Sequence, residues 1–493
     1  MPFPAQGSVI SSENWIVLKF GGTSVASLER WESIASIINE RREQGYRVLV
    51  VCSALSGISN LLEKLLDEIE RGESPDKTLE QLRRRHRTLC KKMGVPTKTV
   101  KPWLNSLSKL IAGISMIGLL TDELRARIMA HGELLSTTIG QARLEAQGVE
   151  VDWRDARDLL TPLPTPIEAT QSRRYLSAVC SSDRNDELIG ELNGGAPVVI
   201  TQGFIARDEY GRTVLLGRGG SDTSGAYFAA QMRAERLEIW TDVPGMFTAN
   251  PKDRPDARLL RLIGYEEAQV MVATGARVLH PRCIRPVAEA DIPLHIRCTS
   301  APTMEGTVIS NEANAEPANV KALSTRHDLY LIRLYEPGNW HVPGWLAEVT
   351  NVFRRHGVAI DLIANSPQNI TITLDPAVTP LGPIEEENLK RDLAEHGDLE
   401  FHQRAGSVSL IGSQITTVIG QLADGLSGIS ASNIHMVNQA SSRDGLSFVM
   451  DPDDVDRVLN PLHDWLLTGP LPDKIFGPSW KELAAKFPKK KKT

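Results

Sequence analysis

The chain reads Ile16-Val17-Leu18-Lys19-Phe20-Gly21-Gly22-Thr23-Ser24 near its start. Here an apolar strand leads into one lysine and a pair of glycines. Glycine has no Cβ, so backbone amides at such a turn can approach a phosphate closely, and a following helix N-terminus favours negative charge. The segment therefore predicts a strand and a phosphate-binding turn of the kind used in phosphoryl transfer. An ordinary loop of the same composition is the alternative.

From residue 15 to about 310, short apolar runs alternate with amphipathic stretches. This pattern is typical of an α/β fold with a mainly parallel sheet covered by helices. Charged helical stretches between about 61 and 130 predict a helical insertion. Five apolar runs are the clearest predicted strands: Ile16–Phe20, Arg47–Ser53, Pro197–Gly203, Arg236–Thr241 and Ile292–Arg297. We therefore expect one domain over 15–310, preceded by a flexible N-terminus at 1–14.

Beyond a proline-bearing connection at Ala301–Pro317 the chain repeats weakly. Each copy has the pattern of a helix followed by two strands. The copies are Gly344–Arg355, Val358–Ala364 and Ile370–Asp375, and then Thr416–Leu426, Ile434–Gln439 and Leu446–Asp451. We therefore predict two similar αβ modules at 318–400 and 401–468, followed by a tail or linker at 469–493. Such a pair fits an effector site between edge strands or a purely structural dimerisation role.

The composition limits the classes of partner. The 493 residues include 55 basic and 61 acidic side chains, and the net charge of −6 gives no general attraction to nucleic acid or to an anionic membrane. No apolar run reaches the roughly 18 residues of a membrane span. The five cysteines are widely spaced, odd in number and without a CxxC pair, which indicates reduced thiols. We therefore expect a cytoplasmic protein that binds neither nucleic acid nor membrane.

A second glycine cluster, Leu216-Gly217-Arg218-Gly219-Gly220-Ser221-Asp222, precedes an amphipathic stretch. It predicts another helix that begins with free amides, so that one domain has two phosphate-compatible turns. Arg218 can form a bidentate pair with a carboxylate or phosphate, whereas Asp222 can orient a lysine or help hold a metal-bound nucleotide. Alternatively, the two side chains are four residues apart on a helix start and pair with each other or cap it.

Two other segments carry candidate chemistry. Trp240–Pro251 leaves a predicted strand into a Pro/Gly-rich loop, a usual place for a nucleotide contact at the carboxyl edge of a sheet. His131-Gly132-Glu133 places a carboxylate that can bind an ammonium or remain a solvated surface charge. The chain has no GxxxxGK[ST], HExxH or GxSxG motif, which disfavours a P-loop fold, a zinc enzyme and a serine hydrolase. No metal-ligating protein site is predicted.

Taken in order, these segments resemble the motifs of the aspartate kinases, a branch of the amino-acid-kinase family. Seven motifs carry the resemblance: Lys19–Val25, Val51–Asn60, His131–Glu133, Gln202–Phe204, Gly217–Asp222, Thr241–Gly245 and Val278–Pro281. The resemblance covers about Trp15 to Leu467 and implies an αβα sandwich followed by two ferredoxin-like ACT modules. The segment Phe476–Trp480 also resembles the junction in bifunctional proteins that join an aspartate kinase to a diaminopimelate decarboxylase.

The resemblance implies that the β-carboxylate of L-aspartate attacks the γ-phosphorus of ATP, bound with Mg2+, to give 4-phospho-L-aspartate. This is the first step toward lysine, threonine and methionine. Lys19 would stabilise the charge on the transferred phosphoryl group, and Asp222 would hold that lysine. Gly21, Gly22 and Ser53 would contact phosphate oxygens. A carboxylate is already ionised at about pH 7, so no strong general base is needed.

The resemblance also assigns residues to the two substrates. Arg218 would bind the α-carboxylate of aspartate and Glu133 its α-ammonium, with Ser59 and Phe204 as further contacts. The residues implied for the nucleotide, besides Lys19 and the glycines, are Ser221, Thr241, Asp242, Phe247, Lys252 and Arg277. The family commonly has Tyr, Arg and Lys at the last three positions, so we expect an altered ATP affinity with catalysis retained.

An effector pocket is implied in the first module. Its residues would be His341, Gly344, Asp361, Asn365 and Ser366. The lysine-binding stretch of the family usually reads Asp-Leu-Ile-Thr-Thr-Ser-Glu, whereas Asp361–Pro367 ends in proline here, so an acidic partner for the ammonium of the effector is missing. The effector is left open between lysine, threonine and none. ACT modules imply a homodimer or higher homo-oligomer formed through them.

Two other functions stay open at this point. One is a kinase of the same fold for another acid, such as glutamate or N-acetylglutamate; Glu133 disfavours an acylated amine, because its charge would have no ammonium to pair with. The other is a non-catalytic amino-acid sensor. The conservative changes around the nucleotide favour a sensor, whereas the presence of Lys19, Arg218, Asp222 and Glu133 opposes it.

Overall fold

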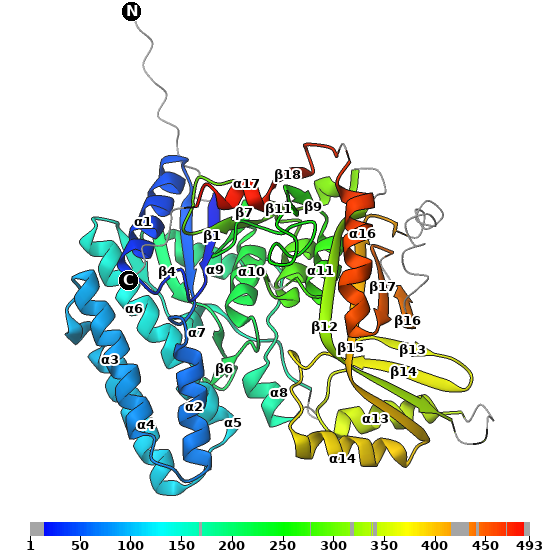
Figure 1. Cartoon of the computed structure of the whole chain (residues 1–493). Coiled ribbons are helices and arrows are strands. Elements are labelled where there is room, and N and C mark those ends of the chain that lie inside the picture. The colour runs from blue at the N-terminus through cyan, green and yellow to red at the C-terminus, as the bar shows by residue number, and fades with distance from the viewer. Residues whose placement is uncertain are drawn as a thin grey trace, which may run out of the picture.

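The computed structural model describes residues 14–166, 170–276, 278–315, 320–336, 338, 343–415, 433–439, 443–469 and 471–487. A large α/β domain with a helical projection occupies one side of the molecule, and an antiparallel sheet with its own helices occupies the other (Figure 1). The predicted helix Thr416–Leu426 lies outside the described residues. No helix within the described ranges is long and apolar enough to cross a membrane.

The first domain is built on an eight-stranded sheet in the order β3-β4-β2-β1-β7-β10-β11-β9. Its neighbouring strands run parallel except for the antiparallel pair β10 and β11. The strands are β1 (Trp15–Phe20), β2 (Arg47–Cys52), β3 (Val151–Trp153), β4 (Val198–Gln202), β7 (Arg236–Thr241), β9 (Leu262–Ile263), β10 (Leu294–Cys298) and β11 (Thr307–Ile309). The prediction of a mainly parallel sheet is confirmed, and each of the five predicted runs forms one of its strands.

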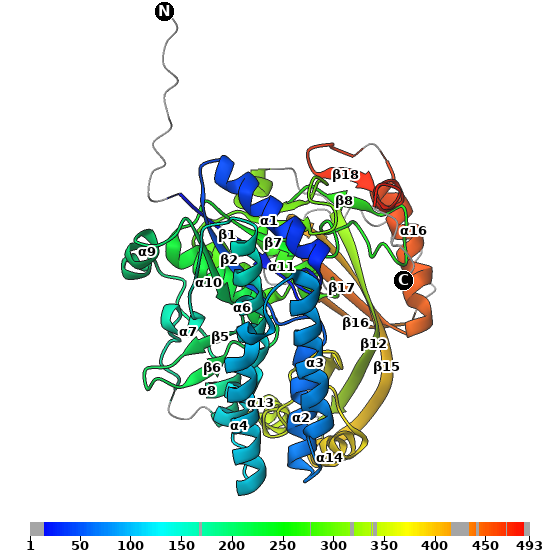
Figure 2. The same cartoon turned by 90° about the vertical axis from the view of Figure 1, so that its left-hand side faces the viewer.

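Helices cover both faces of this sheet (Figures 1 and 2). The helices of this domain outside the helical projection and the C-terminal segment are α1 (Leu28–Glu43), α6 (His131–Ala146), α7 (Ala156–Leu159), α8 (Gln171–Leu176), α9 (Asp186–Asn193), α10 (Gly220–Met232), α11 (Tyr265–Ala273) and α12 (Ile284–Glu289), of which α7 and α8 pack on a small hairpin. The strand residues of β1 are buried throughout, as expected for a sheet with both faces covered. A small hairpin, β5 (Ile205–Arg207) and β6 (Thr213–Leu215), leads into the second glycine cluster.

Four helices form the projection that the sequence predicts as an insertion. They are α2 (Ile58–Glu70), α3 (Asp76–Met93), α4 (Lys101–Ile117) and α5 (Asp122–Met129). In α2, Ile58, Leu62, Leu65 and Leu66 are buried, which is the spacing of one face of a helix. The insertion starts directly after β2, so the first turn of α2 lies at the carboxyl edge of the main sheet.

The second half is one antiparallel six-stranded sheet in the order β13-β14-β12-β15-β17-β16. The strands are β12 (Val320–Tyr335), β13 (Ile363–Asn365), β14 (Asn369–Leu374), β15 (Asp398–Gly412), β16 (Ile434–Gln439) and β17 (Gly445–Met450), and the helices are α13 (Trp345–Arg355), α14 (Pro383–Ala394) and α16 (Val455–Leu467). The prediction of a mainly parallel sheet followed by a second αβ region is confirmed.

The two long strands β12 and β15 are shared by both predicted modules. The end of β12 pairs with β14 and with the start of β15, whereas the start of β12 pairs with the end of β15. Helix α16, the start of β12, the end of β15 and β17 belong to the same hydrophobic core as the main domain. Helices α13 and α14 cover a separate core. The boundaries 318–400 and 401–468 stay predictions, and β15 runs across the division at 400.

The predicted strand Val358–Ala364 is wrong over most of its length, because β13 contains only Ile363–Asn365. The amide of Val358 closes the end of α13 by donating to Phe353 O (2.9 Å), and that of Ala359 donates to Thr379 Oγ1 (3.2 Å). These amides are therefore not available for a regular ladder at the start of the apolar run.

The chain returns to the first domain at its C-terminal end. Strand β18 (Phe476–Ser479) pairs antiparallel with β8 (Arg258–Leu260), and α17 (Trp480–Ala484) follows. Phe476 and Leu483 are buried. The described part of the predicted tail is thus a docked strand and helix, because its apolar side chains find a place against the first domain.

Candidate active site

The candidate site is a cavity of about 490 Å3 at the carboxyl edge of the main sheet. Strands β1 and β2 end there, and helices α2 and α10 begin there, so strand ends and helix N-termini face one space. Nine residues predicted for substrate or nucleotide line this cavity: Lys19, Gly22, Ser53, Ser59, Glu133, Phe204, Arg218, Ser221 and Asp222. The positive ends of two helices favour an anionic ligand at this position.

Lys19 and Asp222 form an ion pair at the floor of the cavity. Lys19 is the fifth residue of β1 and is buried, and Asp222 lies in the first turn of α10. Gly225 lets α10 approach β1 closely, because a Cβ at this position would lie only 3.3 Å from Lys19 Cβ. The ammonium group is therefore held in one place by a carboxylate and by close packing.

Glycines shape the two turns that border the cavity. A Cβ at Gly22 would lie 2.7 Å from Ala54 O, so any side chain there would displace the backbone that follows β2. Gly219 precedes α10 with φ 64°, a conformation that favours glycine. The glycine at position 22 is thus required by packing against the backbone after β2, and its role as a phosphate cradle stays a prediction. The amide of Gly21, in contrast, donates to Trp240 O (3.2 Å) and fixes the turn.

Glu133 provides a buried carboxyl group that lines the same cavity. It lies in the first turn of α6, is only 4% exposed, and accepts a hydrogen bond from Ala54 N (3.2 Å). Burial raises the pKa of Glu133 to about 8, because the charged form loses hydration that one amide only partly replaces. A ligand ammonium placed beside it would restore the charged form, so this wall is suited to a cation.

Arg218 and Phe204 complete the rim. Arg218 is exposed, and its Nη1 donates to Ala377 O in the loop after β14, so a rim residue of the first domain contacts the regulatory half. Phe204 has φ 71°, in the left-handed region that non-glycine residues rarely occupy. Its amide donates to Ser224 Oγ (2.8 Å) on α10, which holds the strained residue in place against the cavity.

A second cavity of about 680 Å3 lies on the other side of the end of β1. It begins at the end of β7, which pairs with β1, so the two cavities adjoin at neighbouring strand ends. Four predicted nucleotide residues line it: Thr241, Asp242, Phe247 and Lys252. Of the other two predicted nucleotide residues, Gly21 lines neither cavity and Arg277 lies outside the described residues.

Comparisons with known proteins agree with this arrangement. The Amino acid kinase family matches residues 14–298. Lysine-sensitive aspartokinase 3 of Escherichia coli (strain K12) is 32% identical over 455 residues, which cover 91% of this chain and 98% of that protein. The chain belongs to the aspartokinases, within the amino acid kinase family. The resemblance predicted from the seven motifs is confirmed.

Two solved structures of E. coli aspartokinase III are similar over 92% of this chain and 99% of theirs, each with a TM-score of 0.75. One is a complex with aspartate and ADP in the R-state, at 29% identity. The other is a complex with lysine and aspartate in the T-state, at 30% identity. Both similarities therefore extend over the kinase half and the regulatory half of this chain.

The predicted effector residues of this aspartokinase are spread along α13 and β13. Gly344 begins α13 with φ 94°, and Asn365 ends β13. Asp361 accepts hydrogen bonds from Arg326 Nη1 (2.8 Å) and Thr373 Oγ1 (2.8 Å), so its carboxylate is engaged inside the sheet. Ser366 Oγ closes the following turn on Asn369. His341 lies outside the described residues, and the effector role of the set stays a prediction.

Sequence reasoning missed several residues that line the two cavities. Arg125 and Met129 reach the first cavity from α5, and Arg326, Asp375 and Trp480 reach the second from the regulatory half and the C-terminal segment. The first four lie in none of the seven motifs, and Trp480 ends the segment Phe476–Trp480, whose resemblance to a junction gives no indication of a cavity. Their positions depend on how distant parts of the chain pack together, which no local pattern records.

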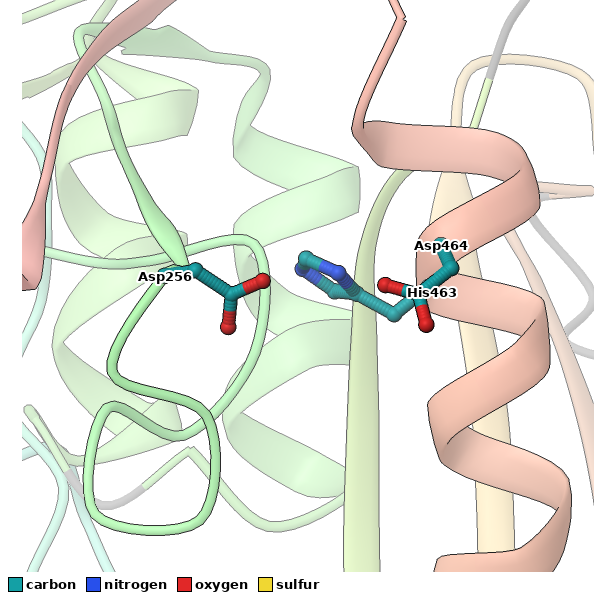
Figure 3. Close-up of side chains that lie close together, drawn as sticks. All are labelled: Asp256, His463 and Asp464. Atoms are coloured by element: carbon teal, nitrogen blue, oxygen red, sulfur yellow. The ribbon is translucent and has the colours of Figure 1, made fainter.

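Asp256, His463 and Asp464 form a group whose possible metal-binding atoms lie within 4.8 Å of one another (Figure 3). His463 projects from α16 toward the loop that carries Asp256. Arg254 donates to Asp256 Oδ2 (2.8 Å) and Asp464 Oδ1 (2.6 Å). Hydrogen bonds to these carboxylates raise the pKa of Arg254 above its usual value. A guanidinium already supplies the positive charge between the carboxylates, so we assign an ion-pair junction and no metal here.

Replacing Arg254 by alanine should lower the free energy of unfolding by about 1–2 kcal/mol. The variant loses contacts to both carboxylates and to Asn460, which join the loop after β7 to α16. The expected loss of unfolding free energy is moderate because the side chains of Asp256 and Asp464 are 53% and 60% exposed, and water screens their charges. Chemical unfolding measures the effect. Arg457→Ala on α16 is the control, because the Arg457 side chain is 55% exposed. An equal loss of unfolding free energy in both variants would contradict the assignment of an ion-pair junction.

Proposed function

We propose that this aspartokinase transfers the γ-phosphoryl group of ATP to the β-carboxylate of L-aspartate, giving 4-phospho-L-aspartate. The observation that carries the proposal is the charge arrangement of one cavity. Lys19, held by Asp222, faces the same space as buried Glu133 and the rim residue Arg218. An amino acid with a second carboxylate matches this set, because it presents an ammonium, an α-carboxylate and a nucleophilic carboxylate together. The E. coli relative solved with aspartate and ADP supports the assignment.

In the proposed reaction the protein positions the substrates and neutralises charge. Glu133 binds the α-ammonium of aspartate and Arg218 its α-carboxylate, with Ser59 and Phe204 beside them. These contacts direct the β-carboxylate toward Lys19, whose ammonium stabilises the negative charge that develops on the transferred phosphoryl oxygens. The attacking carboxylate is ionised at about pH 7, so no residue needs to remove a proton from it.

The nucleotide would extend from the first cavity into the second. Gly22, Ser53 and Ser221 line the first cavity and would contact the phosphate oxygens there, and the glycine at position 22 lets the turn after β1 pack against the backbone that follows β2. Thr241, Asp242, Phe247 and Lys252 line the second cavity, and Arg277 would complete its nucleotide side. Mg2+ would neutralise phosphate charge when bound. The carboxylates suited to it are those of Asp222 and Asp242, because Mg2+ prefers oxygen ligands.

Regulation is part of the proposal. The E. coli relative is named lysine-sensitive, and one of its structures holds lysine. We propose lysine as the first effector to test here and threonine as the second. Pro367 stands where the family has an acidic residue, so we expect weaker inhibition by lysine than a pocket with that carboxylate would give. We also propose that copies of the chain form a homodimer or higher homo-oligomer through the exposed apolar side chains of Ile363, Ile434 and Val437 on the edge strands β13 and β16. A cytoplasmic location agrees with the five free thiols.

The test is the initial rate of Mg-ATP-dependent aspartyl hydroxamate formation by the purified protein, with glutamate and N-acetylglutamate as alternative acceptors. We expect aspartate to be the only one of the three acceptors that gives a rate, and we expect added lysine to lower that rate. A rate with another acid and none with aspartate would contradict the acceptor. Tight binding of ATP and aspartate without any phosphorylated product would identify a sensor instead.

A further inference from the structure

The C-terminal segment 471–487 is anchored to the loop that borders the nucleotide side of the site. The amides of Trp480 and Lys481 donate to Ala257 O (2.8 Å) and Pro255 O (2.9 Å). Arg258 Nε donates to Gly477 O (2.8 Å). Buried Phe476 and Leu483 pack into the first domain from the same segment. These contacts fix a part of the chain that follows the regulatory half onto the wall of the second cavity.

Trp480 is the side chain that this anchoring directs toward the cavity. Ser479 and Glu482 form a capping box that starts α17 at Trp480, so the backbone orientation of the tryptophan is determined. The indole is half-buried and lines the 680 Å3 cavity together with Thr241, Asp242 and Lys252. Its ring meets that of Phe247 edge to face, with centroids 5.6 Å apart and planes at 87°.

We propose that Trp480 is a nucleotide-binding residue, and that Trp480 and Phe247 form an aromatic wall for the adenine base of ATP. The proposal rests on the nucleotide position proposed above. An aromatic wall suits a planar base because every base has a polarisable face that stacks on, or packs against, an aromatic ring. Phe247 alone is buried and presents little surface, whereas the half-buried indole extends the wall into the cavity.

The C-terminal segment 471–487, which follows both regulatory modules in the sequence, would therefore complete the nucleotide side of the active site. Because β18 pairs with β8, and Trp480 and Leu483 share a hydrophobic cluster with Phe247, the segment also holds Phe247 in place. Trp480 is therefore expected to influence ATP binding with little effect on aspartate binding, since the aspartate residues line the other cavity.

The first test measures ADP affinity by calorimetry and the KM values for ATP and aspartate in Trp480→Ala and Trp480→Phe. We expect Trp480→Ala to weaken ADP binding and raise the ATP KM by about tenfold, as loss of one stacking partner does, while the aspartate KM is unchanged. Trp480→Phe should restore most of the affinity. Trp465→Ala, on α16 with the tryptophan 46% exposed, is the matched control and should behave as wild type.

A second measurement decides the matter where Trp480→Ala fails to fold. ADP should change the tryptophan emission of the wild-type protein, and Trp480→Phe should lose most of that change while still binding ADP. Wild-type ADP affinity in folded Trp480→Ala, or an undiminished emission change in Trp480→Phe, overturns the proposal. Both readouts use ADP alone, so they stand even where the wild-type protein fails to phosphorylate aspartate, and the failure of the proposed reaction is seen separately.

Discussion

Replacing Lys19 by alanine should lower kcat by about 10³-fold, the scale seen when a fixed donor to developing charge is removed. Lys19 is buried at the end of β1, and Asp222 and the close approach of Gly225 hold its ammonium against the first cavity. A cation fixed before the reaction needs no reorganisation when negative charge develops on the phosphoryl oxygens. The loss should therefore appear in kcat, measured with both substrates saturating, more than in either KM.

Folding and catalysis must be separated in this variant, because removal of Lys19 leaves Asp222 without its ion-pair partner. Thermal unfolding and ADP binding of Lys19→Ala report on the fold and on the nucleotide site. Lys64→Ala on α2 is the matched control, since the Lys64 side chain is 60% exposed and pairs with Glu68 on the same helix. A kcat of Lys19→Ala within about threefold of wild type would contradict the assigned role.

Local patterns predicted much of the kinase half. The lysine and glycine pair after Leu18 predicted both a strand end and a phosphate turn, and the structure places Lys19 and Gly22 on the same cavity. The steric demand at Gly22 is a tertiary contact, because it arises from the backbone of Ala54 after β2, and the glycine pair alone does not reveal it. Alternation of apolar runs likewise predicted the sheet, since parallel strands buried on both faces read as continuous apolar stretches.

The regulatory half and the nucleotide wall could not be predicted in the same way. Strand β15 crosses the predicted division at 400, and the start of β12, in the first predicted module, pairs with the end of β15 in the second, because pairing partners and not composition decide where a long strand ends. Asp361 has the residue type expected of an effector ligand, yet Arg326 on β12 donates a hydrogen bond to its carboxylate. Trp480 reaches the second cavity only because β18 pairs with β8. Each of these positions depends on long-range packing.

Replacing Glu133 by glutamine should raise the aspartate KM by about 30-fold or more, because truncating one partner of a desolvated charge pair costs roughly 2–5 kcal/mol. Glutamine keeps the shape and can still accept the hydrogen bond from Ala54 N, so the fold should persist. The ATP KM should stay near its wild-type value. Glu145→Gln, on the exposed face of the same helix, is the matched control and should leave both KM values unchanged.

The pH dependence distinguishes a binding role of Glu133 from a structural one. Because burial raises its pKa to about 8, the free protein holds the carboxyl mostly neutral below that pH, and only the charged form pairs with the ammonium of aspartate. The aspartate KM of the wild type should therefore rise by about tenfold for each pH unit below 8, and that of Glu133→Gln should not.

The raised pKa of Glu133 also makes the free energy of unfolding depend on pH. The unfolded chain releases this proton at a lower pH than the folded protein, so wild-type stability should fall as pH rises between about 4.5 and 8, and the glutamine variant should lack this loss. An aspartate KM with the same pH profile in both proteins would exclude Glu133 as the ammonium-binding group.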